Sequence, residues 1–195
     1  MPPLYKSEAD KPIKTDAGWR WSTKDGHALT VSVENQALRL RIVGKPGSKV
    51  GWSLPATTSG DWVVPDGEGI VMNVVDPFWR AAYRKGRCLD ASSTLSFPAW
   101  SLNSNNKAII YALGDSLQSR VCFHDHDGLQ AKLLHDFSTG AETLEILIAV
   151  RPDQPLAPAL FYRQLLKARG QSKSFSDKKV FSSPTVRRAT GLYLG

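Results

Sequence analysis

The residues best suited to chemistry lie in one short polar run, His124-Asp125-His126-Asp127-Gly128. Two imidazoles and two carboxylates within four residues could bind a divalent cation, because both groups are common metal ligands. The spacing Asp-x-Asp-Gly also resembles the start of a calcium loop. An EF-hand loop that began at Asp125 would need a glutamate at its twelfth position, where this sequence has Asp136. The run therefore matches the EF-hand pattern only in part.

The residues that flank this run favour a plain hairpin loop. When Phe123 is paired with Leu129, apolar residues face apolar residues along both flanking strands, and the whole run is left in an exposed loop. We therefore expect a loop without a cofactor. The less favoured alternative is a divalent cation held by His124, Asp125, His126 and Asp127.

Tryptophan side chains are the second group with a possible binding role. Aromatic faces stack on sugar rings, so exposed tryptophans with polar neighbours could line a glycan groove. A large β-sandwich also needs bulky side chains in its core and at a domain junction, and we favour that role for any single tryptophan. Trp79 and Trp100 are the best candidates for a surface that meets another domain. The candidates for glycan binding or a domain junction are Trp52, Trp62, Trp79, Trp100, Asp76 and Arg80, with Asp61 as a further polar partner.

Composition and charge exclude several classes of protein. Residues 1–150 contain 16 Lys plus Arg and 16 Asp plus Glu, whereas residues 151–195 contain 9 and 2, so the net charge of +7 lies entirely in the last part of the chain. A nucleic-acid-binding β domain carries its basic surface on the body of the domain, so we expect no nucleic acid partner. We expect no membrane partner either, because the sequence has no apolar run of about 18 residues. The first residues lack the apolar core of a signal peptide, which makes a cytoplasmic location the default expectation.

Period-two alternation of apolar and polar residues predicts a mostly β fold. In a hairpin over residues 29–42, pairing Val33 with Leu38 places every apolar side chain on one face and the arginines on the other. Residues 107–150 alternate in the same way between short turns, and we interpret them as an antiparallel meander packed on one side. Cys88 and Cys122 can make at most one bridge, and we favour buried thiols, because two cysteines are too few for a disulfide framework and their spacing does not suggest zinc.

The periodicity changes near the C-terminus. Residues 156–169 predict one helix with Gly170 as its C-terminal cap, and residues 171–184 form a linker rich in Ser and Lys. Residues 191–195 have the pattern of a further buried strand, so we expect a chain that continues into another domain.

Four motifs in this order resemble those of a known family. They are Trp62-Val63-Val64-Pro65-Asp66-Gly67-Glu68-Gly69, Asp76-Pro77-Phe78-Trp79, Leu95-Ser96-Phe97-Pro98-Ala99-Trp100 and His135-Asp136-Phe137. The order resembles the N-terminal, galactose-mutarotase-like β-sandwich that precedes the catalytic barrel of certain glycoside hydrolases. The resemblance implies a large antiparallel two-sheet sandwich with one C-terminal helix. It divides the chain into an extended lead-in (1–26), the sandwich (27–153), and a helix, basic linker and start of a missing barrel domain (154–195).

The resemblance implies an accessory domain without catalytic machinery. Hydrolysis of a glycosidic bond needs two carboxyl groups roughly 5 to 9.5 Å apart. The five glutamates lie in turns or on alternating strand positions, and none forms a convincing acid and base pair. His135 has no identifiable partner for epimerase chemistry. The expected function is a scaffold domain of a carbohydrate-active enzyme whose partner is a glycan or the barrel, and the alternative is a stand-alone carbohydrate-binding or protein-interaction module.

Overall fold

The computed structural model describes residues 11–16, 18–24, 26–54, 57–114, 118–138, 142–154 and 156–172. The chain divides into two compact units, Met1–Ala159 and Leu160–Gly195, and every strand in the described residues lies in the first. The elements are β1 (Ile13–Thr15), β2 (Gly18–Ser22), β3 (Ala28–Glu34), β4 (Ala37–Val43), β5 (Lys49–Ser53), β6 (Asp61–Val64), β7 (Ile70–Asn73), α1 (Pro77–Ala82), β8 (Arg87–Asp90), β9 (Ala99–Ser104), β10 (Lys107–Leu113), β11 (Ser119–Asp125), β12 (Leu129–Asp136), β13 (Thr143–Pro152) and α2 (Ala157–Ala168).

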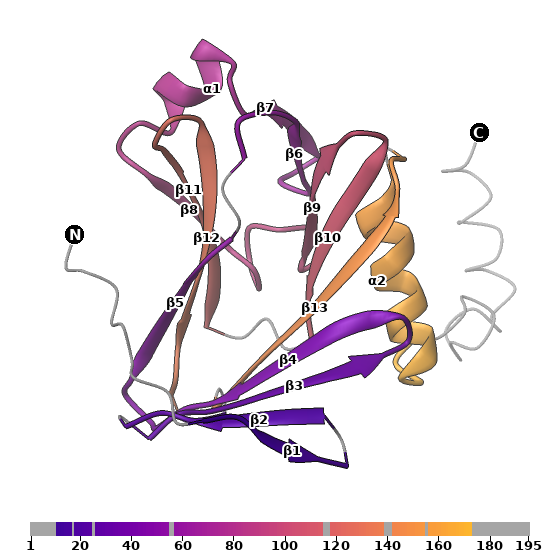
Figure 1. The fold of residues 1–195 in the computed structure, drawn as a ribbon. Helices are drawn as coiled ribbons and strands as arrows, with labels where there is room; N and C mark the ends of the chain where they lie inside the picture. Colours follow the sequence, from indigo (N-terminus) through magenta and orange to yellow (C-terminus); the bar gives the residue numbers. More distant parts are fainter. Residues whose placement is uncertain are drawn as a thin grey trace, which may run out of the picture. The chain divides into compact units, whose positions relative to one another are not determined.

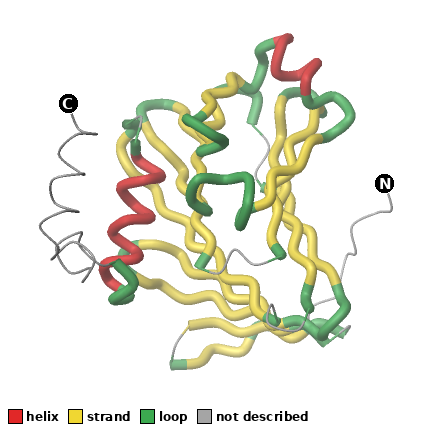
Figure 2. Tube along the Cα trace, turned by 180° about the vertical axis from the view of Figure 1, so that it is seen from behind, coloured by secondary structure: helices red, strands yellow, loops and turns green. Residues whose placement is uncertain are grey.

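The strands form two antiparallel sheets. The larger sheet has nine strands in the order β1-β2-β3-β4-β13-β10-β9-β6-β7, and the smaller has four in the order β5-β12-β11-β8. Figure 1 shows the small sheet on the left and β9, β10 and β13 of the large sheet on the right, and Figure 2 shows these strands from behind. The prediction of a mostly β fold built from two antiparallel sheets is confirmed.

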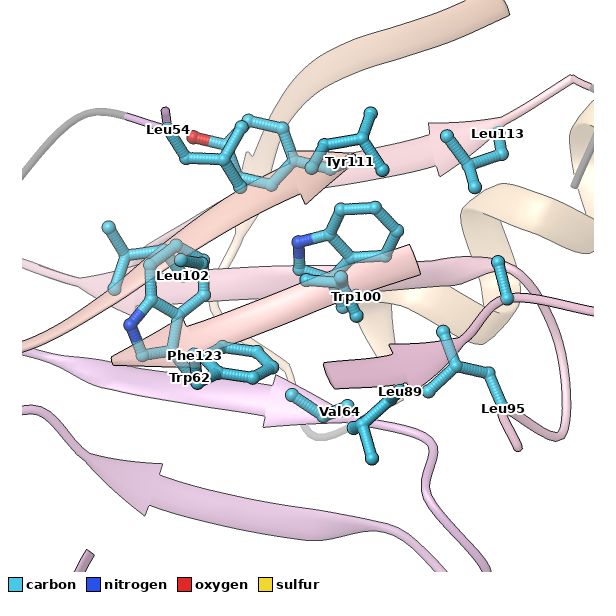
Figure 3. Close-up of a cluster of buried hydrophobic side chains, with 14 of the residues drawn as sticks. Leu54, Trp62, Val64, Leu89, Leu95, Trp100, Leu102, Tyr111, Leu113 and Phe123 are labelled. Carbon is cyan, nitrogen blue, oxygen red and sulfur yellow. The ribbon is translucent and has the colours of Figure 1, made fainter. Parts of the chain in front are cut away.

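Aromatic residues from both sheets fill the space between them. Trp62 of β6 contacts Phe123 of β11, with ring centroids 5.7 Å apart, and both side chains are fully buried. The Trp62 Nε1–H donates a hydrogen bond of 2.8 Å to the Leu129 carbonyl, so a large-sheet side chain is tied to the small-sheet backbone. Figure 3 shows these rings with Trp100 and Tyr111, which stack with centroids 6.1 Å apart. Burial of each such ring stabilises the sandwich by about 1.5–3 kcal/mol.

The hairpin predicted over residues 29–42 is confirmed as β3 and β4. Val33 pairs with Leu38, in the register expected from the apolar pattern. The turn has only two residues, Asn35 and Gln36, and both have a left-handed backbone, with φ of 49° and 61°. Such turns match the right-handed twist of paired strands, which explains why the hairpin closes so tightly.

The predicted meander over residues 107–150 is wrong in its connections. Strand β10 belongs to the large sheet, β11 and β12 form a hairpin in the small sheet, and β13 returns to pair with β10. Between β10 and β13 the chain therefore crosses to the small sheet and back again. Alternation reports which side of a strand is buried but not which sheet buries it, because the two inner faces present the same pattern to the core.

The ends of the chain differ from expectation in one respect. Residues 1–26 were expected to be an extended lead-in, but β1 and β2 join the edge of the large sheet through β3. The predicted C-terminal helix is confirmed as α2, and Gly170 follows it with φ of 65°, donating its N–H to the Lys167 carbonyl. The basic linker from residue 173 onward and the predicted strand at 191–195 lie outside the described residues. Neither helix described is long and apolar enough to cross a membrane.

Candidate functional site

The polar run is only partly a loop. His124 and Asp125 belong to β11, and the hairpin loop contains His126, Asp127 and Gly128. The last two residues have positive φ values of 54° and 132°, which Asp tolerates and glycine adopts freely. The prediction that all five residues lie in an exposed loop is therefore wrong.

The error is a register shift of two residues. Phe123 pairs with Ala131 instead of Leu129, and Asp125 takes Leu129 as its partner. A shift of two residues leaves every side chain on the same face, so matching apolar residues could not distinguish the two registers.

An ion pair connects the polar run to the short helix α1. Arg80 Nε donates to Asp125 Oδ1 at 2.7 Å, so the last residue of β11 holds the helix. The same guanidinium holds the pKa of Asp125 below its usual range, through this hydrogen bond and through its charge. The Asp125 carboxylate is thus ionised and already has a partner.

Helix α1 begins with a conventional cap. The Asp76 carboxylate accepts a 2.7 Å hydrogen bond from the Phe78 N–H, and Pro77 occupies the first turn, where a missing amide donor costs least. Asp76, Trp79 and Arg80 belong to one group predicted from sequence, and of these Arg80 contacts Asp125 from the other group.

A shallow hollow of about 340 Å³ lies beside this ion pair. It has an apolar wall from proline and alanine and polar groups from two arginines and one aspartate. The lining residues are Pro77, Arg80, Ala81, Arg84 and Asp125. We take this hollow as the candidate functional site, because it combines an apolar surface with the charged groups that bind sugar hydroxyls.

The described residues around His124-Asp125-His126-Asp127 do not form a cluster of metal ligands. Among the residues that the structure describes, no three His, Cys, Asp or Glu side chains lie together in a way that could hold a metal ion. A cation at Asp125 would also have to compete with Arg80.

We expect calorimetric titration with calcium or zinc, after chelation, to give no heat of binding at micromolar concentrations. A carboxylate that has an arginine partner is a poor ligand, because the cation must first break the ion pair. A micromolar dissociation constant for either ion would favour the cation site at His124, Asp125, His126 and Asp127.

The lowered pKa of His124, in β11, predicts that the stability of the protein depends on pH. Burial lowers the pKa of His124, and the nearby charges of Lys132 and His126 lower it further. Because the folded pKa is below the unfolded value of about 6.5, the stabilising contribution is complete above that value and is lost as the pH falls through the folded pKa. We expect His124→Gln to make the loss of stability between about pH 7 and 5 shallower, as measured by urea unfolding. Parallel pH profiles for the two proteins would contradict this assignment.

The four candidate tryptophans occupy different environments. Trp62 and Trp100 are fully buried, so neither offers an indole face to a ligand or to another domain. Trp52 in β5 and Trp79 in α1 are partly buried against the core and keep some exposed surface. Trp79 belongs to the helix that lines the hollow, and its ring contacts that of Phe78, with the ring centroids 5.0 Å apart. Sugar binding by Trp52 or Trp79 stays a prediction.

His135 lies in a buried pair instead of an open site. Its Nδ1 lies 2.8 Å from Ser119 Oγ, and both side chains are buried. A serine and a histidine at this distance could do nucleophilic chemistry if a substrate could reach them. Their burial excludes a substrate, so the pair is a structural link between β11 and β12.

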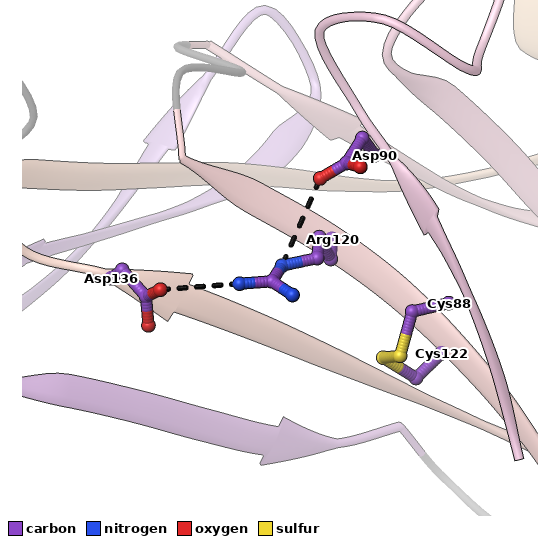
Figure 4. Close-up of a disulfide and its surroundings, with 5 residues drawn as sticks. All are labelled: Cys88, Asp90, Arg120, Cys122 and Asp136. Atoms are coloured by element: carbon purple, nitrogen blue, oxygen red, sulfur yellow. Dashed lines mark hydrogen bonds and ion pairs between the residues drawn. A yellow bond between two sulfur atoms is a disulfide. The ribbon is translucent and has the colours of Figure 1, made fainter.

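The two cysteines form a disulfide, so the prediction of buried thiols is wrong. Cys88 of β8 and Cys122 of β11 are directly opposite each other in adjacent strands. Figure 4 shows the bond together with Arg120. The Arg120 guanidinium lies 3.7 Å from the Asp90 carboxylate and 3.2 Å from the Asp136 carboxylate. The sequence did not reveal this pairing because β9 and β10, which belong to the other sheet, separate the two strands.

A second hollow, of about 260 Å³, was not predicted from sequence. Its lining is mainly apolar and comes from β6, β7 and nearby loops, with Val63, Val71, Phe97 and Leu156 among the residues. These residue types fill protein cores everywhere, so only the fold could reveal that they surround a surface hollow.

Comparison with known proteins finds similarity in structure only. No family model matches the chain, and no curated protein matches it in sequence. The chain superposes on the ligand-free α-N-acetylgalactosaminidase NagBb from Bifidobacterium bifidum with a TM-score of 0.66 and 11% identity, over 89% of this chain and 32% of that one. For the Gal-NHAc-DNJ complex of the same protein, the TM-score is 0.69 at 12% identity, over 95% of this chain and 34% of that one. This likeness shows the fold, and the chain spans about a third of the glycosidase that it resembles.

Proposed function

We propose that this chain is a non-catalytic β-sandwich domain of a glycoside hydrolase and serves as a scaffold for the catalytic domain. The observation that carries the proposal is that nearly the whole chain superposes on about a third of a glycosidase. The motif order, which resembles the galactose-mutarotase-like domain in front of a catalytic barrel, supports the same assignment. The partner would then be the catalytic domain of the same protein.

The carboxylates whose partners are known support a non-catalytic role. Glu145 is buried and pairs with Arg39, Asp125 pairs with Arg80, and Asp136 pairs with Arg120 and Lys49. A general acid needs a raised pKa, and the hydrogen bond from Arg80 lowers the pKa of Asp125. Asp125 is therefore poorly suited to protonate a leaving group, and Glu145 and Asp136 are already held in ion pairs.

We expect the purified chain to release no sugar from aryl glycosides. The physical reason is that hydrolysis needs a free carboxylic acid and a carboxylate base, and in the part of the chain that the structure describes Glu145, Asp125 and Asp136 each have an arginine partner. The measurement is the release of nitrophenol from a panel of α- and β-nitrophenyl glycosides, including the N-acetylgalactosaminides. Turnover that stays with the protein through purification, and that is lost on Asp125→Asn, would show a catalytic site in this chain.

A stand-alone carbohydrate-binding module is the second candidate. The hollow beside Arg80 and Asp125 favours it, since a sugar could place one face against Pro77 and Ala81 while its hydroxyls bind the charged groups. A glycan array with the purified chain tests this candidate. Binding that disappears in Arg80→Ala and persists in Arg20→Ala, on the distant strand β2, would favour it over the scaffold role.

The disulfide indicates the kind of compartment in which the protein folds. Disulfides persist in oxidising compartments and are rare in the cytosol. We therefore expect Cys88–Cys122 to form in an exported protein, which goes against the default expectation of a cytoplasmic location.

A further inference from the structure

One face of the large sheet carries a row of aliphatic side chains, of which Val33, Leu38 and Val150 are exposed and Ile109 and Ile148 are partly buried. Val33 pairs with Leu38 across β3 and β4, and Leu38 pairs with Ile148 of β13. Val150 follows Ile148 on the same face and pairs with Ile109 of β10. Directly paired residues share a face of the sheet, so these five side chains form one surface, which we call the apolar stripe.

The apolar stripe continues the inner face of the sandwich. One step along the strands, Leu40 and Ile146 are buried in the core between the sheets. Beyond them the exposed fraction rises to 41% at Leu38, 55% at Val150 and 78% at Val33. The inner face therefore stays apolar where the four-stranded sheet no longer covers it.

On β3 and β4 the opposite face is polar at this level, whereas on β10 and β13 it carries the buried residues Ile110, Leu147 and Ala149. Arg39 lies between Leu38 and Leu40 on β4 and pairs with Glu34 and Glu145. Apolar and polar residues thus alternate along β3 and β4 in the pattern of strands whose apolar face is covered along its whole length. Contiguous apolar surface of this kind marks a contact with another protein surface or with a ligand.

The chemistry of the apolar stripe points to a protein surface. Sugars bind through hydroxyl hydrogen bonds and aromatic stacking. The apolar stripe consists only of valine, leucine and isoleucine, which offer neither. Aliphatic side chains that lose water against other aliphatic side chains are typical of permanent domain contacts.

We propose that the apolar stripe is the surface on which the catalytic domain of the same polypeptide docks. This inference rests on the proposed function, which supplies the partner. In the glycosidase that the chain resembles, about two thirds of the protein lies outside the matched region, and a corresponding remainder of this polypeptide is the occupant that we propose. The apolar stripe offers an apolar, preformed surface for that contact.

Single introduced thiols test the inference. Leu38→Cys places a thiol on the apolar stripe, and Val43→Cys places one on the opposite face of the same strand, at a similar exposed fraction of 42%. Both native cysteines of this chain are in the disulfide, so each introduced thiol is its only free one, and in the longer protein the labelled position is identified by peptide mass. The rate of maleimide alkylation is measured in this chain alone and in the protein encoded by the complete reading frame.

We expect the longer protein to be alkylated about tenfold more slowly at position 38 than this chain is, with no change at position 43, because docking excludes water from the apolar stripe. Equal rates at position 38 in the two proteins would overturn the inference and leave the proposed function standing if the longer protein hydrolyses glycosides. Protection at position 38 in this chain alone that grows with concentration would identify a second copy as the occupant and would also overturn the inference. A reading frame without a catalytic domain would overturn both.

Discussion

Removal of the Cys88–Cys122 bond is expected to lower the free energy of unfolding by about 4 kcal/mol. The two cysteines are 34 residues apart, so the bond restricts a long loop in the unfolded chain. The bond also holds β8, an edge strand whose described pairing is with β11 alone. The measurement is chemical unfolding of the double variant Cys88→Ser and Cys122→Ser beside the oxidised protein.

Reduction supplies the control for this prediction. Dithiothreitol should shift the unfolding midpoint of the native protein to that of the double variant and should leave the double variant unchanged. If thiol titration of the unreduced protein finds two free cysteines, or if reduction has no effect on the midpoint, the bond does not stabilise the fold.

The second large effect is expected at the tryptophan that joins the two sheets. Trp62→Ala should cost about 3–5 kcal/mol, because it removes a fully buried ring and leaves a cavity between the sheets. Trp19→Ala is the matched control, since Trp19 of β2 is exposed and its loss should change stability by less than about 1 kcal/mol. Thermal unfolding of the two variants measures the difference.

Two milder substitutions isolate the hydrogen bond between the sheets. Trp62 Nε1–H donates to the Leu129 carbonyl, whereas the buried Trp100 Nε1–H has no hydrogen-bond partner among the residues that the structure describes. Replacement by phenylalanine removes a similar volume at both positions but removes a hydrogen bond only at Trp62. Trp62→Phe should therefore be about 1–2 kcal/mol more costly than Trp100→Phe. Equal costs would mean that the bond contributes nothing net to stability.

Local patterns in the sequence predicted the elements well. The β3–β4 hairpin and α2 follow from the spacing of Val33, Leu38 and the apolar residues after Pro155, and neighbouring residues determine these features. The assignment of strands to sheets was not predictable in the same way. The path of the chain from β10 through β11 and β12 to β13 depends on contacts that alternation does not encode.

The candidate site shows the same division. The cap at Asp76 could be predicted because the cap and Pro77 are adjacent in the sequence. The Arg80–Asp125 pair and the Cys88–Cys122 bond could not be predicted, because each joins residues more than thirty positions apart. Both links attach the segment that contains α1 and β8 to β11, so the fold creates the site from residues that the sequence presents separately.

The most direct test compares glycoside hydrolysis by this chain, by the protein from the complete reading frame, and by that protein without residues 1–159. If the chain is a scaffold domain, the complete protein should cleave an aryl glycoside, this chain should not, and removal of the sandwich should abolish or strongly reduce the activity. Turnover by this chain alone, or full activity without the sandwich, would contradict the proposed function.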